Sequence, residues 1–124
     1  MICYVDGGYN NNNKSDGYGS FAAFDSNGNL IDKISFLLPE ANSSNEAEYY
    51  SLSYLITWLE ANNLPSEKDG CIIYSDSRLM INQVNGYWKV RASNLQVLVD
   101  KIKLPPYTKL DWVDRNRIVD VLGH

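Results

Sequence analysis

Two aspartates occupy positions where their carboxylates could do chemistry together. Asp6 and Asp76 each directly follow an apolar, strand-like run, residues 2–5 and 71–74. Ligand sites in α/β sheets gather at the carboxyl ends of parallel strands, so these two carboxylates converge if their strands are neighbours. Local roles are the alternative, since Asp76 could be a helix N-cap and Asp6 a turn residue before Gly7. The positions of the other acidic residues distinguish a shared site from these local roles.

A glutamate adds to the pair from a predicted helix. Glu48 is in register with three leucines at steps of four, three and four residues, namely Leu52, Leu55 and Leu59. This stripe is the side of an amphipathic helix that faces a sheet. Burying an unpaired carboxylate is costly, so Glu48 requires a cation or a proton unless it is a partly solvated first-turn acid. Glu46 falls on the wetter side of the same helix and is explained as a cap.

Asp120 is the fourth candidate, because it interrupts the apolar stretch at residues 116–122. Three or four carboxylates in one pocket repel one another, and hard ions such as Mg²⁺ or Mn²⁺ prefer oxygen ligands. Two such ions about 4 Å apart can activate water and stabilise the leaving oxygen of a phosphodiester. The pattern therefore predicts a metal site for phosphodiester hydrolysis, carried by Asp6, Glu48, Asp76 and Asp120.

Other catalytic chemistries find little support in this sequence. The single histidine is His124, which leaves no basis for a Ser/His/Asp triad or for a zinc site built on histidines. Gly17 and Gly19 lead into a strand rather than a helix, so they form no phosphate-binding loop. Cys3 and Cys71 lie in apolar runs and are expected to be buried free thiols.

The acids must be positioned by alternating strands and helices. Runs rich in β-branched and aromatic residues predict strands at 2–5, 17–24, 30–38, 71–74 and 110–113. Periodicity and capping signals predict helices at 43–62, 79–86, 92–102 and 116–122. A turn at residues 26–29 makes the first three strands an antiparallel series. The expected fold is α/β, a mixed five-stranded sheet flanked by about four helices, in one domain of residues 1–124.

The charge distribution limits how nucleic acid could be bound. A net charge of -4 argues against binding by bulk electrostatic attraction. Residues 78–103 nevertheless hold five basic residues and one acidic one, and form the one candidate for a phosphate-facing surface. No apolar run approaches the ~20 residues needed to cross a bilayer, so a membrane protein is not expected. The first residues lack the basic and apolar parts of a secretory signal, so a cytoplasmic location is expected.

Five blocks of the sequence, in order, match the signature of a known family. They are Tyr4-Val5-Asp6-Gly7-Gly8, Gly17-Tyr18-Gly19, Ser43-Ser44-Asn45-Glu46-Ala47-Glu48-Tyr49, Tyr74-Ser75-Asp76-Ser77, and Trp112-Val113 with residues 116–122. In these blocks the chain resembles type 1 ribonuclease H. The resemblance implies the sheet order 3-2-1-4-5, the acidic metal quartet named above, and a requirement for Mg²⁺ with Mn²⁺ as a substitute. It also implies endonucleolytic hydrolysis of the RNA strand of an RNA/DNA hybrid, with 5′-phosphate products. The chain itself is expected to act as a monomer.

The resemblance also implies a set of substrate contacts. They are Gly7, Asn12, Ser43, Ser44, Asn45, Arg78, Trp88 and Lys89. The block at 43–45 stands where the family has Thr-Asn-Asn, and short polar groups suit the 2′-hydroxyls of a shallow minor groove. Arg78 stands where many members have glutamine, and the short interval from Asp76 to Trp112 leaves little room for the additional basic helix of some members.

Two other functions remain open from the sequence. The short C-terminal segment and the missing basic helix leave room for a non-catalytic nucleic-acid-binding module on the same fold. A metal-dependent nuclease acting on DNA or on double-stranded RNA is the other alternative.

Overall fold

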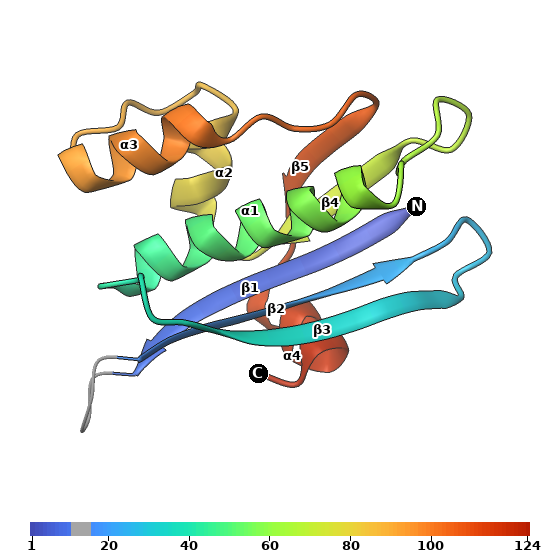
Figure 1. Ribbon diagram of the computed structural model, residues 1–124, viewed down its shortest axis with the longest axis horizontal. Coiled ribbons are helices and arrows are strands. Elements are labelled where there is room, and N and C mark those ends of the chain that lie inside the picture. The colour runs from blue at the N-terminus through green and yellow to red at the C-terminus, as the bar shows by residue number, and fades with distance from the viewer. Residues whose placement is uncertain (11–15) are drawn as a thin grey trace.

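A five-stranded sheet in the order β3-β2-β1-β4-β5 organises residues 1–10 and 16–124, the part of the chain that the computed structural model describes (Figure 1). The strands are β1 (Ile2–Asn10), β2 (Asp16–Phe24), β3 (Leu30–Leu38), β4 (Cys71–Ser75) and β5 (Thr108–Trp112). The first three strands are antiparallel, whereas β4 runs parallel to β1 and β5 runs parallel to β4. The predicted mixed sheet and its strand order are therefore confirmed.

Local turn chemistry joins β2 to β3. The Asp25 carboxylate accepts hydrogen bonds from the backbone N–H groups of Asn27 and Asn29, both at 2.9 Å. Gly28 has a φ of 82°, a left-handed conformation that glycine adopts without a steric penalty. The predicted turn at 26–29 is confirmed, and it fixes the register of the two strands.

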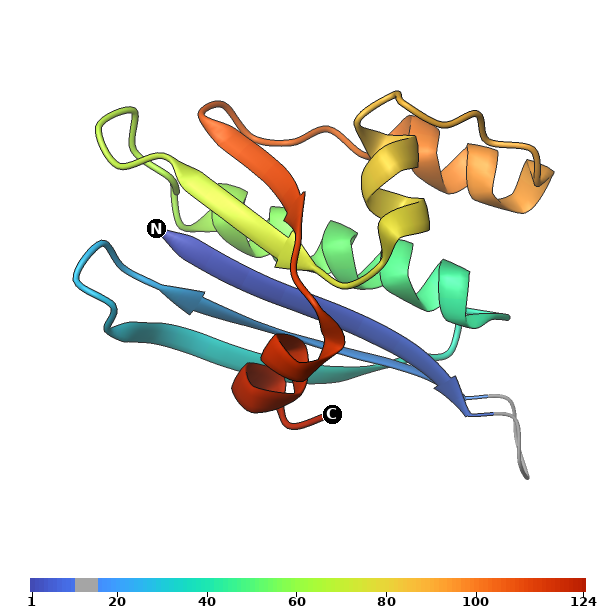
Figure 2. The same cartoon turned by 180° about the vertical axis from the view of Figure 1, so that it is seen from behind.

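The helices cover the two faces of the sheet unequally. They are α1 (Ser44–Ala61), α2 (Arg78–Val84), α3 (Ser93–Lys101) and α4 (Arg115–Leu122). Figure 1 shows α1 to α3 on one side of the sheet, and Figure 2 shows α4 crossing the opposite side. Alternation along β1 agrees with this arrangement, because Cys3 and Val5 belong to the core under α1 whereas Tyr4 packs with Ile118 and Leu122 of α4.

The main core lies between α1 and the sheet. Leu52, Leu55 and Leu59 are fully buried, as their spacing predicts. Cys3 and Cys71, on the neighbouring strands β1 and β4, are buried free thiols whose Sγ atoms lie 3.7 Å apart. This confirms the expectation for both cysteines. Among the helices described, none has the length and apolar character needed to cross a membrane.

Glu46 differs from its prediction as a residue of the wetter helix side. Its side chain is only 8% exposed, because α3 packs beside the start of α1 and the Asn94 amide donates a hydrogen bond to it at 2.9 Å. It does act in capping, since the Ser43 hydroxyl accepts from the Glu46 N–H at 3.1 Å and Glu46 accepts from the Asn42 N–H at 3.3 Å. The carboxylate is thus held by local and tertiary partners together.

Candidate metal centre

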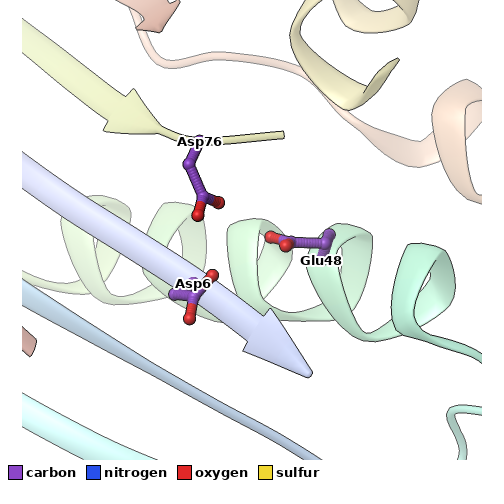
Figure 3. Close-up of side chains that lie close together, drawn as sticks. All are labelled: Asp6, Glu48 and Asp76. Atoms are coloured by element: carbon purple, nitrogen blue, oxygen red, sulfur yellow. The ribbon is translucent and has the colours of Figure 1, made fainter. Parts of the chain in front are cut away.

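Parallel pairing of β1 with β4 brings two aspartates to the same edge of the sheet. Tyr4 is opposite Tyr74 in the register, so Asp6 and Asp76 each lie two residues further along neighbouring strands. Figure 3 shows their side chains pointing toward one another at this edge. The convergence predicted from the two strand ends is confirmed.

A glycine lets the helix α1 approach close enough to add the third carboxylate. A Cβ atom at Gly7 would lie 2.4 Å from the Ala47 carbonyl oxygen and 2.7 Å from the Glu48 nitrogen, so only glycine fits here. The Gly7 backbone also lies near the Glu48 carboxylate, where it partly offsets the rise in the pKa of that group. Ser43 caps α1 at its first residues and so fixes where the helix starts. The Glu48 side chain then points from α1 toward Asp6 and Asp76 (Figure 3).

The three carboxylates form one compact cluster. Asp6, Glu48 and Asp76 each offer an oxygen, and these oxygens lie within 4.8 Å of one another. The Asp6 side chain is 2% exposed and that of Asp76 is 14% exposed, so the cluster is buried on one side and open to solvent on the other. Two buried oxygens, Asp6 Oδ1 and Glu48 Oε2, have no hydrogen-bond partner among residues 1–10 and 16–124. An all-oxygen donor set with unpartnered oxygens fits a hard divalent cation.

The crowding of negative charge perturbs two of the acids. Burial is the main cause that raises the pKa of Glu48 well above its ordinary value, and the charges of Asp6 and Asp76 add to it. Burial likewise raises the pKa of Asp6, against the opposing hydrogen bond from Arg115. The ionised cluster is therefore unfavourable without a compensating cation.

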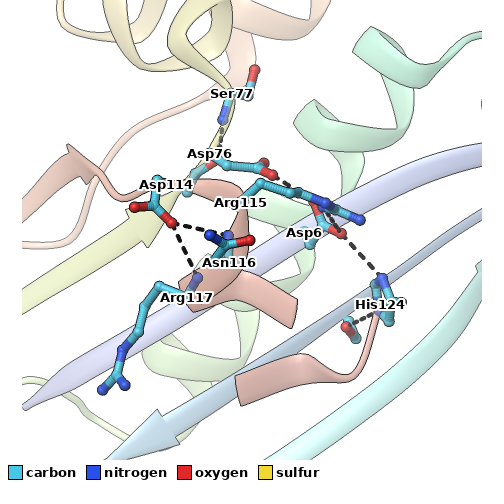
Figure 4. Close-up of polar contacts among 10 residues, drawn as sticks. Asp6, Asp76, Ser77, Asp114, Arg115, Asn116, Arg117 and His124 are labelled. Atoms are coloured by element: carbon cyan, nitrogen blue, oxygen red, sulfur yellow. Dashed lines mark hydrogen bonds and ion pairs between the residues drawn. The ribbon is translucent and has the colours of Figure 1, made fainter. Parts of the chain in front are cut away.

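Arg115 of α4 brings positive charge to the acidic cluster. Its Nη1 donates hydrogen bonds to Asp6 Oδ2 at 2.9 Å and to Asp76 Oδ2 at 3.0 Å (Figure 4). Sequence reasoning did not single out this residue. The signal was present, because Arg115 lies three residues before Ile118 and seven before Leu122, which places it on the sheet-facing side of α4.

His124 closes the centre on the side of β2. Its Nδ1 lies 3.1 Å from Asp6 Oδ2 without the geometry of a hydrogen bond, and its Nε2 contacts the Ser20 hydroxyl (Figure 4). The ring also packs edge-on against Tyr18, with ring centroids 5.6 Å apart. The single histidine thus borders the acidic cluster and covers Asp6 on the side of β2.

Comparison with solved structures identifies the architecture. No family model matches the sequence, and no curated protein matches it either. LC11-RNase H1, solved in complex with an RNA/DNA hybrid, is 24% identical and superposes with a TM-score of 0.82, over 98% of this chain and 91% of that one. The fold is that of ribonuclease H1.

Two further ribonuclease H structures agree with this conclusion. RNase H1 from the archaeon Halobacterium salinarum is 18% identical, with a TM-score of 0.75 over 98% of this chain and 92% of that chain. The N-terminal RNase H domain of a Mycobacterium tuberculosis protein is 20% identical, with a TM-score of 0.73 over 98% of this chain and 88% of that chain. The resemblance deduced from the sequence blocks is confirmed at the level of the ribonuclease H fold.

The position of Asp120 differs from the prediction. Among the residues described, the acidic cluster comprises Asp6, Glu48 and Asp76 and does not include Asp120. The reason is helical geometry, because α4 packs through Ile118 and Leu122, and a residue two positions from each points away from the sheet. Asp120 is accordingly exposed. On this ribonuclease H fold the fourth acid of the predicted quartet is therefore outside the cluster.

The predicted substrate contacts lie in several parts of the fold. Asn45, Trp88 and Lys89 line one groove, whose other lining residues include Arg91. Ser43 is the half-buried N-cap of α1, and Ser44 beside it is exposed.

On the β5 side of the ribonuclease H sheet, the Arg78 guanidinium stacks on Trp112, 4.2 Å from the ring centroid. Gly7 contacts the start of α1, as described above, and this packing explains the glycine without a substrate. Asn12 lies outside the residues that the structure describes.

Proposed function

We propose that this protein is a metal-dependent ribonuclease H that hydrolyses the RNA strand of RNA/DNA hybrids. The observation that carries the proposal is the cluster of Asp6, Glu48 and Asp76 at the carboxyl edge of a ribonuclease H-fold sheet. Its two buried, unpartnered oxygens favour a bound cation over a purely structural role for the acids. The complex of LC11-RNase H1 with an RNA/DNA hybrid supports the choice of substrate.

The three carboxylates would hold Mg²⁺, with Mn²⁺ as a substitute. Bound there, one or two divalent ions supply an activated water and stabilisation of the leaving oxygen, which yields 5′-phosphate and 3′-hydroxyl ends. Asp6 offers an oxygen from within β1, Asp76 offers one directly after β4, and Glu48 offers one from the N-terminal part of α1. No protein nucleophile is needed for this reaction.

The substrate would also lie across the groove that Asn45 lines, three residues before Glu48 in α1. Trp88 is 50% exposed and Tyr87 is 78% exposed, and both line this groove together with Lys89 and Arg91. Exposed aromatic and basic side chains suit a sugar-phosphate backbone, which they contact without reading the bases. Asn45 lies in the same groove, where its amide could contact a 2′-hydroxyl of the RNA strand.

Cleavage of a 5′-labelled RNA/DNA hybrid in Mg²⁺ tests the proposal. Asp76→Asn removes one charged oxygen from the cluster and should lower the rate by at least about 100-fold. Asp100→Asn, the same chemical change on the exposed side of α3, is the matched control and should cleave like the unaltered protein. Equal rates in all three proteins, or no cleavage by the unaltered protein in either metal, would reject the proposal.

The exposed position of Asp120 favours a second candidate, a non-catalytic hybrid-binding module. This candidate predicts salt-sensitive binding of the hybrid without turnover in Mg²⁺ or Mn²⁺. Running duplex DNA and duplex RNA beside the hybrid distinguishes the proposed enzyme from a nuclease with a different substrate.

A further inference from the structure

One side-chain nitrogen connects two of the three carboxylates. Arg115 Nη1 donates to Asp6 Oδ2 and to Asp76 Oδ2, at 2.9 Å and 3.0 Å, so it bridges β1 and the residue that follows β4 (Figure 4). A divalent cation held between these two aspartates would use the same pair of carboxylates. A guanidinium and a metal ion cannot occupy this position together, because they overlap in space and repel each other electrostatically.

The arginine is anchored at its backbone but free at its tip. The Asp114 side chain caps α4 by accepting from the Asn116 N–H at 2.9 Å, and Ile118 and Leu122 are buried against the sheet. The Arg115 side chain is nevertheless 54% exposed, and its hydrogen bonds to Asp6 and Asp76 are both made by Nη1 alone. The side chain can therefore swing out of the cluster by rotamer changes without unfolding α4.

The contact also leaves the cluster only partly compensated. Arg115 brings one positive charge to three carboxylates, and Asp6 Oδ1 and Glu48 Oε2 remain without a partner. A divalent cation brings twice that charge and can use the remaining oxygens. The guanidinium is thus a weaker occupant that a divalent ion can displace.

We propose that Arg115 is a built-in counter-ion that occupies the metal-free centre and withdraws when a divalent cation binds. Metal binding then requires that the Arg115 contacts break. The apparent dissociation constant for metal is therefore the intrinsic constant divided by the fraction of molecules in which Arg115 has left the cluster. The inference rests on the proposed function only in requiring that the acidic cluster bind a divalent cation.

Calorimetric titration of the intact protein with Mn²⁺, in the absence of nucleic acid, tests the competition. Arg115→Gln removes the guanidinium and should tighten Mn²⁺ binding by about tenfold. The matched control is Arg117→Gln, which removes the same charge from the same helix. Arg117 donates instead to the Tyr4 hydroxyl, at 3.2 Å from Nη2, and should change Mn²⁺ binding by less than about twofold. Equal affinities in the two variants, or no Mn²⁺ binding in any protein, would overturn the inference.

Displacement can be observed directly in the unaltered protein. The Arg115 side-chain N–H resonances, assigned by their absence from the Arg115→Gln spectrum, should shift on addition of Mg²⁺, while those of Arg117 stay in place. Arg115 resonances that do not respond when Mg²⁺ binds would contradict the proposal. These binding measurements are independent of cleavage. A protein that cleaves no hybrid but shows the tenfold difference in Mn²⁺ affinity would reject the proposed ribonuclease activity and support the counter-ion role of Arg115. A protein that cleaves the hybrid without that difference would support the activity and reject the counter-ion role.

Discussion

Replacing Glu48 with glutamine should make the metal-free protein more stable, although it removes a carboxylate from the proposed metal centre. Glu48 Oε2 is buried without a hydrogen-bond partner, and the other two acids lie beside it. Glutamine has nearly the same shape, carries no charge, and places N–H donors beside the Asp6 and Asp76 carboxylates. The substitution thus removes charge repulsion while preserving the packing.

The size of the effect follows from the geometry of the cluster. Asp6, Asp76 and Arg115 together carry one net negative charge, and at 4.8 Å an effective dielectric constant of about 20 gives a repulsion of roughly 3.5 kcal/mol with Glu48. Solvent on the open side of the cluster reduces this value, so we expect a stabilisation of about 1 to 3 kcal/mol. For a chain of 124 residues this corresponds to a rise in Tm of roughly 4 to 12 °C.

Thermal unfolding in EDTA and in excess Mg²⁺ measures both parts of the argument. Metal at about 100 times its Kd adds about 2.7 kcal/mol to the unaltered protein by mass action, and it should add much less to Glu48→Gln. Glu60→Gln, on the exposed last turn of α1, is the control and should change the metal-free Tm by little. A lower metal-free Tm for Glu48→Gln than for the unaltered protein would refute the charge-crowding argument.

Three further predictions concern the same end of the sheet. The stability advantage of Glu48→Gln should be largest at a pH above the raised pKa of Glu48 and should shrink as the pH falls through that pKa toward the ordinary value of 4.5, because protonated Glu48 carries no charge in the folded state. Urea unfolding at several pH values measures this advantage, and an advantage that does not change with pH would contradict the prediction. Gly7→Ala should lower the free energy of unfolding by about 1 to 3 kcal/mol and weaken Mn²⁺ binding, because the added Cβ meets the backbone of Ala47 rather than a movable side chain. An unchanged free energy of unfolding in urea would contradict the close approach of β1 to α1. Ser43→Ala should cost about 1 kcal/mol through loss of the α1 N-cap, measured by urea unfolding, with Ser53→Ala in the middle of the helix as control.

Local signals made the start of α1 predictable from the sequence. The capping residues around Ser43 fix where the helix begins, and the leucine stripe then fixes which way Glu48 points. Both features depend on residues within a few turns of each other. The position of Asp76 directly after β4 was predictable for the same reason, whereas Asp6 lies within β1 and not at its end. The adjacency of the two aspartates depended on a parallel pairing of β1 with β4 that no local signal encodes.

Features set by packing between distant elements were missed. The strand expected at residues 2–5 extends to Asn10, because Gly7 and Gly8 pair with β2 and Gly7 makes room for α1. The end of the chain was correctly expected to be helical, yet the orientation of α4 on the sheet decides that Arg115 enters the cluster and Asp120 leaves it. A helical pattern identifies a buried side but not what lies opposite it.

The placement of β4 next to β1 also has a kinetic consequence. The antiparallel series β1-β2-β3 is continuous in sequence, whereas the centre needs β4, which arrives after α1 and pairs with a strand about 70 residues earlier. Contacts that span so much of the chain are expected to form late on the folding route. A cation bound there would hold the finished molecule together without helping to nucleate it, so it should lengthen the lifetime of the native state and leave the refolding rate nearly unchanged.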